Sequence, residues 1–201
     1  MANSHSRQNY PDYSVVNPVT YLLSGHVTPT TQSSKEHVHN MDFWPGEYTK
    51  TWVYARRGDP FEILAALRGG SMFTVHGDLV DRLEMGLHSS DAMAPMGGTL
   101  VLDKRGQTVE LRARIREAAG SNFAGRTPKV HHVDVIAGEV QGIVKDRAAM
   151  TNETTRVVRQ LPVDEMKREG PWLSFSHRFE RVERPMYVRL RGTNRDLEGP
   201  A

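Results

Sequence analysis

The chain has 201 residues, of which 38% are hydrophobic and 25% charged, a composition that is typical of a folded globular protein and excludes a disordered one. The net charge of +2 argues only weakly for an anionic partner. We do not expect this partner to be nucleic acid, because nucleic-acid-binding proteins usually concentrate their positive charge more. No run reaches the roughly 18 apolar residues of a membrane span and the polar start lacks a secretory signal, so we expect no membrane contact and, by default, a cytoplasmic location.

The first third of the chain contains the candidate metal ligands. A short predicted strand ends just before "SGHVTP" and places His26 in a loop, where functional residues often lie. Further on, "EHVHNMDFWPGEY" puts His37 and His39 one residue apart, so that both would project to the same side of an extended segment. With Asp42 or Glu47 brought back by the Pro-Gly turn, a site with three ligands is geometrically possible.

The chain has no cysteine, so any metal must be held by His, Asp or Glu. These ligands suit zinc, manganese or iron, and we expect a divalent ion of this group as the cofactor. The alternative is that the histidines are ordinary polar groups of a loop. In that case "WPGEY" is a structural corner in which Trp44 and Tyr48 pack and Gly46 makes the turn.

The next element is a helix in "DPFEILAALRGG". Asp59 can cap its start, Pro60 suits the first helical position, and Glu62 would complete a capping box. Gly69 is expected to provide the left-handed exit. Its apolar residues Phe61, Leu64 and Leu67 share one face, which predicts that the helix packs against another part of the protein.

From Met72 onward nearly all segments are typical of strands. In "TVELRARIR", hydrophobic residues at 109, 111, 113 and 115 alternate with charged ones, so Ile115 should be buried and Arg114 exposed. "RLEMGLH" alternates in the same way, and "TLVLDKRGQTVEL" suggests a hairpin that turns at Asp103 to Gly106. Further strands are expected in "MFTVH", "HHVDVIA", "TRVVRQL", "WLSFSHRF" and "MYVRLRG".

Many short strands separated by Gly and Pro indicate an antiparallel β-sandwich. In a strand, His131 and His132 would point to opposite faces, one toward the core and one toward solvent. Arginine rows at 112, 114 and 116 and at 189 and 191 are interpreted as solvated faces, since few aromatic residues interleave with them.

Several motifs in a constant order resemble one known family. These are "DFWPGEYTKTWVYA", the capped helix ending in "ALRGG", "FTVHGDLVDRLEM", "GGTLVL", "VDVIAGEV" and "MYVRLRGTN". Their order is similar to the C-terminal half of bacterial metal-dependent phosphoesterases of the polymerase and histidinol phosphatase superfamily. The resemblance implies an α+β protein: a partial α/β lobe at 1–75, which is the end of a barrel, then an antiparallel β-sandwich at 76–195 and a tail at 196–201.

The resemblance also implies a function, the hydrolysis of a phosphoester small molecule with the help of a divalent metal. His37 falls on a ligand histidine of the family, whereas Lys35 stands where the family has an aspartate and has no lone pair to offer a metal. The chain also has no room for the family's earlier ligands. We therefore expect a C-terminal fragment or a degenerate member. The alternative is a non-catalytic β-sandwich module that binds a glycan, a partner protein or another copy of itself.

Overall fold

The computed structural model describes residues 49–56, 58–122, 125–143, 146, 148 and 151–195. Ten strands, one α-helix and one 3₁₀ helix are found in this part of the chain. In chain order they are β1 (Thr49–Val53), α3 (Pro60–Gly69), β2 (Met72–His76), β3 (Val80–His88), β4 (Met93–Pro95), β5 (Gln107–Glu117), β6 (His132–Glu139), β7 (Arg156–Pro162), η3 (Val163–Glu165), β8 (Lys167–Glu169), β9 (Trp172–Val182) and β10 (Met186–Thr193).

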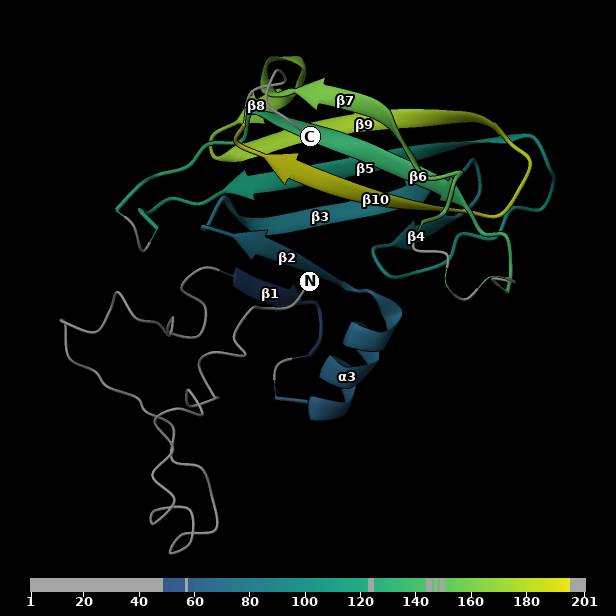
Figure 1. Cartoon of the computed structure of the whole chain (residues 1–201), viewed down its shortest axis with the longest axis horizontal. Coiled ribbons are helices and arrows are strands. Elements are labelled where there is room, and N and C mark those ends of the chain that lie inside the picture. The colour runs from purple at the N-terminus through teal and green to yellow at the C-terminus, as the bar shows by residue number, and fades with distance from the viewer. Residues whose placement is uncertain are drawn as a thin grey trace, which may run out of the picture.

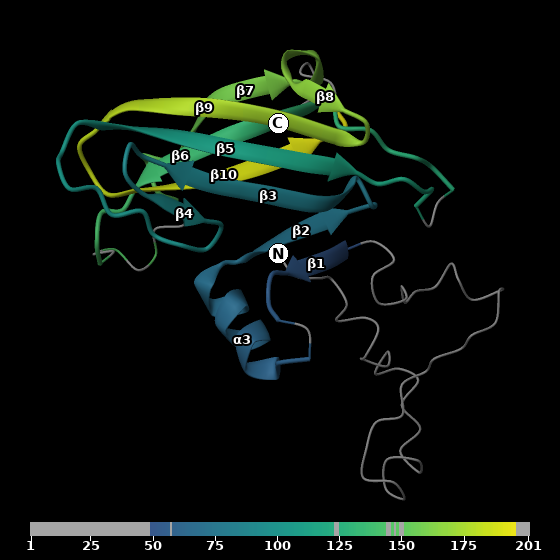
Figure 2. The same ribbon diagram turned by 180° about the vertical axis from the view of Figure 1, so that it is seen from behind.

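The strands form three antiparallel sheets (Figure 1). The largest has the order β4-β3-β5-β9-β8, the second has the order β10-β6-β7, and β1 pairs with β2 alone. Seen from behind, the long strands β3, β5 and β9 run side by side, while β1, β2 and α3 lie below them (Figure 2). The prediction of a β-rich, antiparallel protein is confirmed.

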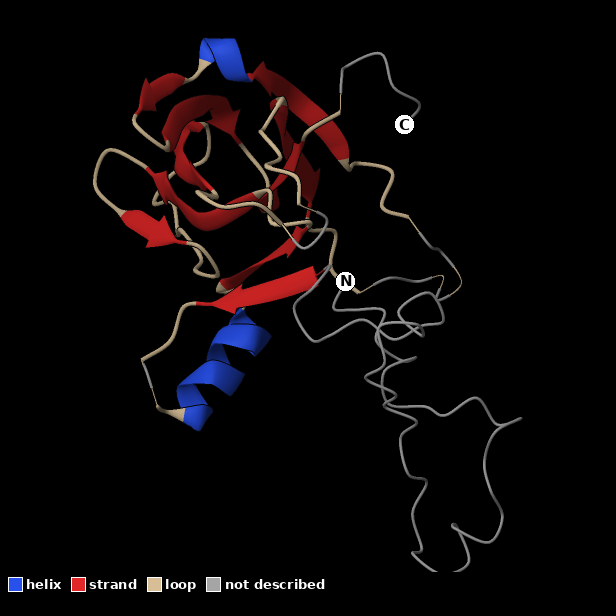
Figure 3. Cartoon of the chain, turned by 90° about the vertical axis from the view of Figure 1, so that its left-hand side faces the viewer, coloured by secondary structure: helices blue, strands red, loops and turns tan. Residues whose placement is uncertain are grey.

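The two larger sheets share one hydrophobic core. Leu111 of β5 and Leu173 of β9 are completely buried, and so is Val135 of β6 in the other sheet. Burying a side chain of this size is worth about 1.5–3 kcal/mol each. Viewed from the end, the strands curve around this core, and α3 stands apart from it (Figure 3).

β5 shows why the sequence forms a half-buried strand. Its hydrophobic residues at 109, 111, 113 and 115 are all buried, while Arg112 and Arg114 are exposed. On the solvent side Arg114 donates to Glu84 on β3 at 2.6 Å and lies over the Trp172 ring, 4.6 Å from its centroid. The predicted register of this strand is confirmed.

The helix α3 begins as the sequence predicts and ends one residue later. Asp59 accepts hydrogen bonds from the backbone N–H groups of Phe61 and Glu62, which satisfies two of the donors that a helix start leaves free. Two details of the prediction are wrong. Gly70, with φ of +78°, is the left-handed residue instead of Gly69, and Glu62 accepts from the backbone of Arg56 instead of closing a capping box.

The expectation that the apolar face of α3 packs against the protein is not met by the described residues. Phe61 is 80% exposed, and Leu64 and Leu67 are exposed as well. Only Ala66 on this helix is buried. The face predicted to form a contact is therefore open to solvent in the described part of the chain.

The predicted hairpin at Asp103 to Gly106 is half right. The chain does turn there, Gly106 has φ of +79°, and β5 starts at the next residue. The preceding residues 99–102 form no strand. The position beside β3 that the first arm of such a hairpin could take is occupied by β4 at Met93–Pro95.

The predicted division into a lobe at 1–75, a sandwich at 76–195 and a tail at 196–201 stays a prediction. The described part of the first segment is β1, α3 and β2, and residues 1–48 lie outside the described residues. Among the described residues, no helix has the length and hydrophobicity required to cross a membrane.

Candidate ligand-binding cleft

A cleft with a volume of about 1390 Å³ lies between the two larger sheets. One wall consists of β2, β3, β4 and the segment 96–102, and the other consists of residues 182–194, which include the whole of β10. The base is formed by core residues such as Val109, Val133 and Phe179. Small-molecule sites usually enclose about 300–1,000 Å³, so this space suits a larger or elongated ligand.

The alternation of the strands makes the cleft apolar. Leu83, Met85 and Leu87 of β3 project into it from one wall, and Val188 and Leu190 of β10 project from the other. Each is only partly buried and packs against the core at its base. The same period-2 pattern that forms the core therefore continues along both walls.

The segment 96–102 completes one side of the cleft. Its Val101 is 75% exposed although it lines the cavity, and Val140 at another point of the rim is 55% exposed. Gly97 anchors this segment to the end of α3, with φ of +81°. A side chain at this position would lie 2.6 Å from the backbone nitrogen of Ser71, so only glycine permits this approach.

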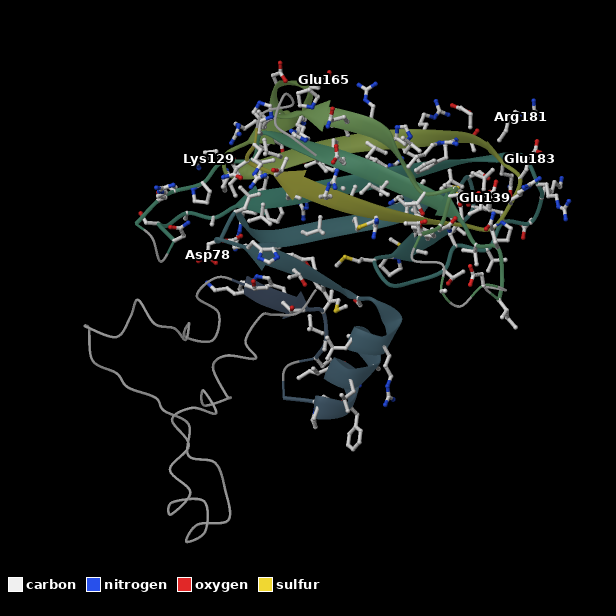
Figure 4. All side chains as sticks on the ribbon, in the orientation of Figure 1. Asp78, Lys129, Glu139, Glu165, Arg181 and Glu183 are labelled. Carbon is white, nitrogen blue, oxygen red and sulfur yellow. The ribbon has the colours of Figure 1, made fainter. Side chains whose placement is uncertain are left out.

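Charged residues gather at the rim. Lys104, Arg105 and Arg189 line the cleft, and among the described residues no ion pair of theirs is found. Glu183 lies at the end of the cleft near Glu139, while Lys129 lies at the other end of the protein (Figure 4). Arg184 pairs with Glu139 at 3.1 Å, so the negative charge at this end is already partly balanced.

A second polar cluster lies on the outer face of β6. Asp134 is 1% exposed, and its carboxylate accepts from Arg191 at 2.8 and 3.0 Å and from Gln160 at 3.0 Å. His132 is also buried, with its Nε2 3.8 Å from the same carboxylate. The donors around Asp134 satisfy a charge that would be costly to bury alone, and they tie β10, β6 and β7 together.

The prediction that His131 and His132 point to opposite faces is wrong. Their Nδ1 atoms lie 3.0 Å apart and their rings meet edge to face. The register pairs Thr193 with His132. The backbone N–H of His131 nevertheless also donates to the Thr193 carbonyl. Two successive residues of one strand therefore lie opposite a single residue of the other. Such an extra residue disturbs the alternation of side chains, which explains the shared side. His132 is buried, as one of the two was expected to be.

The metal ligands predicted from the sequence all lie outside the described residues. These are His37 and His39, with His26, Asp42 and Glu47 as possible additional contacts. Lys35 lies in the same part of the chain. Among the described residues no group of three His, Asp or Glu side chains has the arrangement needed to hold a metal ion. The metal site and the identity of the metal therefore stay predictions.

The residues of the cleft were not predicted as a site. Their inward orientation follows from the alternation, but the alternation does not indicate that the facing sheets would leave space between β3 and β10. A weak signal was present in residues 95–102, where proline, glycines and hydrophobic residues are mixed.

We found no family model, no curated protein and no solved structure that matches this chain.

Proposed function

We propose that the described part of the chain is a binding module that accepts an apolar, elongated ligand between its two larger sheets. The observation that carries this proposal is the cleft, whose walls come from both sheets of what we interpret as a β-sandwich. Binding would remove from water side chains that are now only partly buried, such as Leu83, Met85 and Leu190. Each 100 Å² of apolar surface buried in this way would contribute about 2.5 kcal/mol before the costs of association.

The proposal is tested with an apolar fluorescent dye, anilinonaphthalene sulfonate, titrated into the full chain. We expect saturable binding with one site. Val101→Glu and Val140→Glu place a charge at the rim of the cleft. Each should lower the affinity for the dye at least tenfold. Val157→Glu is the matched control, because Val157 is a similarly exposed valine, 45% exposed, that does not line the cleft.

A second control separates the cleft from the open face of α3. Leu64→Glu removes apolar character from that face, where Leu64 is 49% exposed. If Leu64→Glu or Val157→Glu lowers the affinity for the dye as much as Val101→Glu does, the cleft is not the binding site. A chain that shows no saturable binding would also contradict the proposal.

The metal-dependent phosphoesterase is a second proposal, and it concerns the segment that contains His37 and His39. The order of its motifs and the His-x-His spacing support it. A divalent ion held there would lower the pKa of a bound water molecule and polarise a phosphoester. His26, Asp42 and Glu47 are the further side chains that would contact the metal or the substrate.

Metal analysis of the purified chain, together with a screen of phosphomonoesters and phosphodiesters, tests this second proposal. His37→Ala should remove bound metal, because a site that loses one of three ligands holds an ion poorly. Lys35→Asp should strengthen binding, since it replaces an ammonium group with an oxygen ligand. A chain that purifies without stoichiometric metal, and that neither substitution alters, would contradict a working site.

A further inference from the structure

Among the described strands, one strand of the cleft wall has no partner along one of its two edges. β10 is the outer strand of its sheet and pairs only with β6 among the described strands. All its residues from Met186 to Thr193 line the cleft. A free edge presents a row of backbone N–H and C=O groups that can pair with another strand.

The ladder shows which groups these are. The N–H of Val140 donates to the carbonyl of Pro185, and the register continues without a shift to Thr193. Since hydrogen-bonded pairs alternate along an antiparallel ladder, the odd-numbered residues of β10 bond to β6. The N–H and C=O groups of Met186, Val188, Leu190 and Gly192 therefore point to the free edge.

The side chains of β10 would not obstruct a strand at this edge. Natural edge strands often carry an inward-pointing charge that blocks such pairing. All eight residues of β10 line the cleft, but strand alternation divides their side chains between two faces. Met186 and Gly192 share the face on which Val188 and Leu190 pack against the core, and none of these four residues is charged. The apolar side chains of an added strand would thus continue the apolar wall.

The opposite face of β10 determines which residues an added strand should have on that side. Arg189 and Arg191 alternate with the apolar residues and are exposed. Arg191 is bound to Asp134, whereas Arg189 has no ion pair within the described part of the chain. A strand beside β10 would place every second side chain next to these arginines, where opposite charges across a strand pair are favourable.

We propose that an extended segment of a partner protein adds to the free edge of β10 as an antiparallel strand, with apolar residues facing the cleft and acidic residues facing Arg189. This inference rests on the proposed binding function and names the class of partner. Eight residues match the length of β10, which at about 3.3 Å per residue is roughly 26 Å. Strand addition of this kind takes its affinity from backbone hydrogen bonds and its specificity from alternate side chains.

The test uses an eight-residue peptide that alternates valine and glutamate, added to the full chain in a calorimetric titration. In an antiparallel pair, residues directly opposite each other have side chains on the same face, so the valines of the peptide would lie opposite Val188 and Leu190 and exchange hydrogen bonds with them. N-methylation of the valines should weaken binding at least tenfold. N-methylation of the glutamates, whose N–H groups point away from β10, should leave it within about threefold. A scrambled peptide of equal composition should bind at least tenfold more weakly.

A charge reversal on the protein tests the acidic preference. Arg189→Glu should weaken the valine–glutamate peptide and favour one that alternates valine and lysine. Arg156→Glu is the control, because Arg156 is an exposed arginine on β7, the strand at the opposite edge of the same sheet. Equal binding of the scrambled peptide, or indifference to N-methylation of the valines, would overturn the proposal. So would a dimer of the chain that the peptide dissociates, since the occupant would then be a second copy.

The two proposals fail in different ways. If the dye binds and Val101→Glu weakens it, but no peptide binds, the cleft is a binding site and the added strand is wrong. If neither the dye nor the peptide binds, both proposals are wrong.

Discussion

At the scale of single residues, the position of a side chain in its strand decides its contribution to stability. Ile115 and Arg114 are neighbours on β5, yet Ile115 is 5% exposed and belongs to the core, whereas Arg114 lies on the solvent face. The neighbouring positions thus permit a comparison in which the secondary structure and the strand are the same.

We expect Ile115→Ala to lower the free energy of unfolding by about 2–5 kcal/mol, because it leaves a cavity in the shared core. Arg114→Ala should cost about 1 kcal/mol or less, since its ion pair with Glu84 and its contact with Trp172 are exposed to water. Urea unfolding of both variants measures the difference. The reverse order would show that the register of β5 is wrong by one residue.

Glu117 is a buried carboxylate with a defined set of partners. Burial alone would raise its pKa, but the Arg168 guanidinium and the Val130 N–H donate to the carboxylate, and Lys129 lies nearby, so the pKa is held below its usual value. Because the pKa is lower in the folded state, the unfolded state binds more protons in acid. This contribution to stability is present above the unfolded pKa of about 4.3 and is lost as the pH falls through the folded pKa.

We therefore expect Glu117→Gln to be less stable than wild type at pH 7 and to lose less stability between pH 7 and pH 3. Glu169→Gln is the control: its pair with Lys167 is exposed to solvent and contributes little. Urea unfolding at the two pH values tests this. If wild type and Glu117→Gln lose equal stability on acidification, the carboxylate does not have the stabilising role that its contacts indicate.

At the scale of elements, the ends of α3 depend on local interactions. Asp59→Ala should lower stability by about 0.5–2 kcal/mol, because it removes the acceptor for the N–H groups of Phe61 and Glu62. Asp59→Asn keeps an acceptor oxygen and should cost much less. Thermal melting followed by circular dichroism compares the three proteins. If Asp59→Ala melts as the wild type does, the side chain is not the cap.

The junction between α3 and the segment 96–102 depends on a close approach of two backbones. Gly97 and Gly106 both have φ near +80°, so alanine would be strained at either position by about 1–2 kcal/mol. At Gly97 the added carbon would also meet the backbone of Ser71 and Gly69, whereas at Gly106 no atom lies within 4 Å. We expect Gly97→Ala to lower the free energy of unfolding by about 1–3 kcal/mol more than Gly106→Ala does, as measured by urea unfolding. Equal losses would mean that this contact is not formed.

At the scale of the whole molecule, the described part of the chain has two larger sheets that share one core and line one cleft. They share a core around Leu111, Val135 and Leu173, but β3 and β10 are not hydrogen-bonded to each other. The cleft occupies the space between these two strands. Among the described residues, no strand pairing therefore joins β3 to β10 where ligand binding is proposed.

The sequence by itself determined the features that depend on neighbours in the chain. Alternation along β5 gave the buried set that includes Ile115, and Asp59 with Pro60 marked the start of α3, because strand pleat and helix capping act over two to four residues. The same alternation failed at His131 and His132, where a backbone bond to Thr193, about sixty residues away, shifts the side chains.

Only the tertiary structure decided the exposure of the α3 face, the absence of a strand at 99–102 and the cleft between β3 and β10. Each of these depends on which distant segments meet and how far apart they come to rest. A period of apolar residues shows that a face prefers burial, but it contains no information about what covers that face. The cleft lies beside the core around Leu111 and Leu173, and among the described strands β10 pairs with β6 alone, which alternation along a single strand cannot indicate.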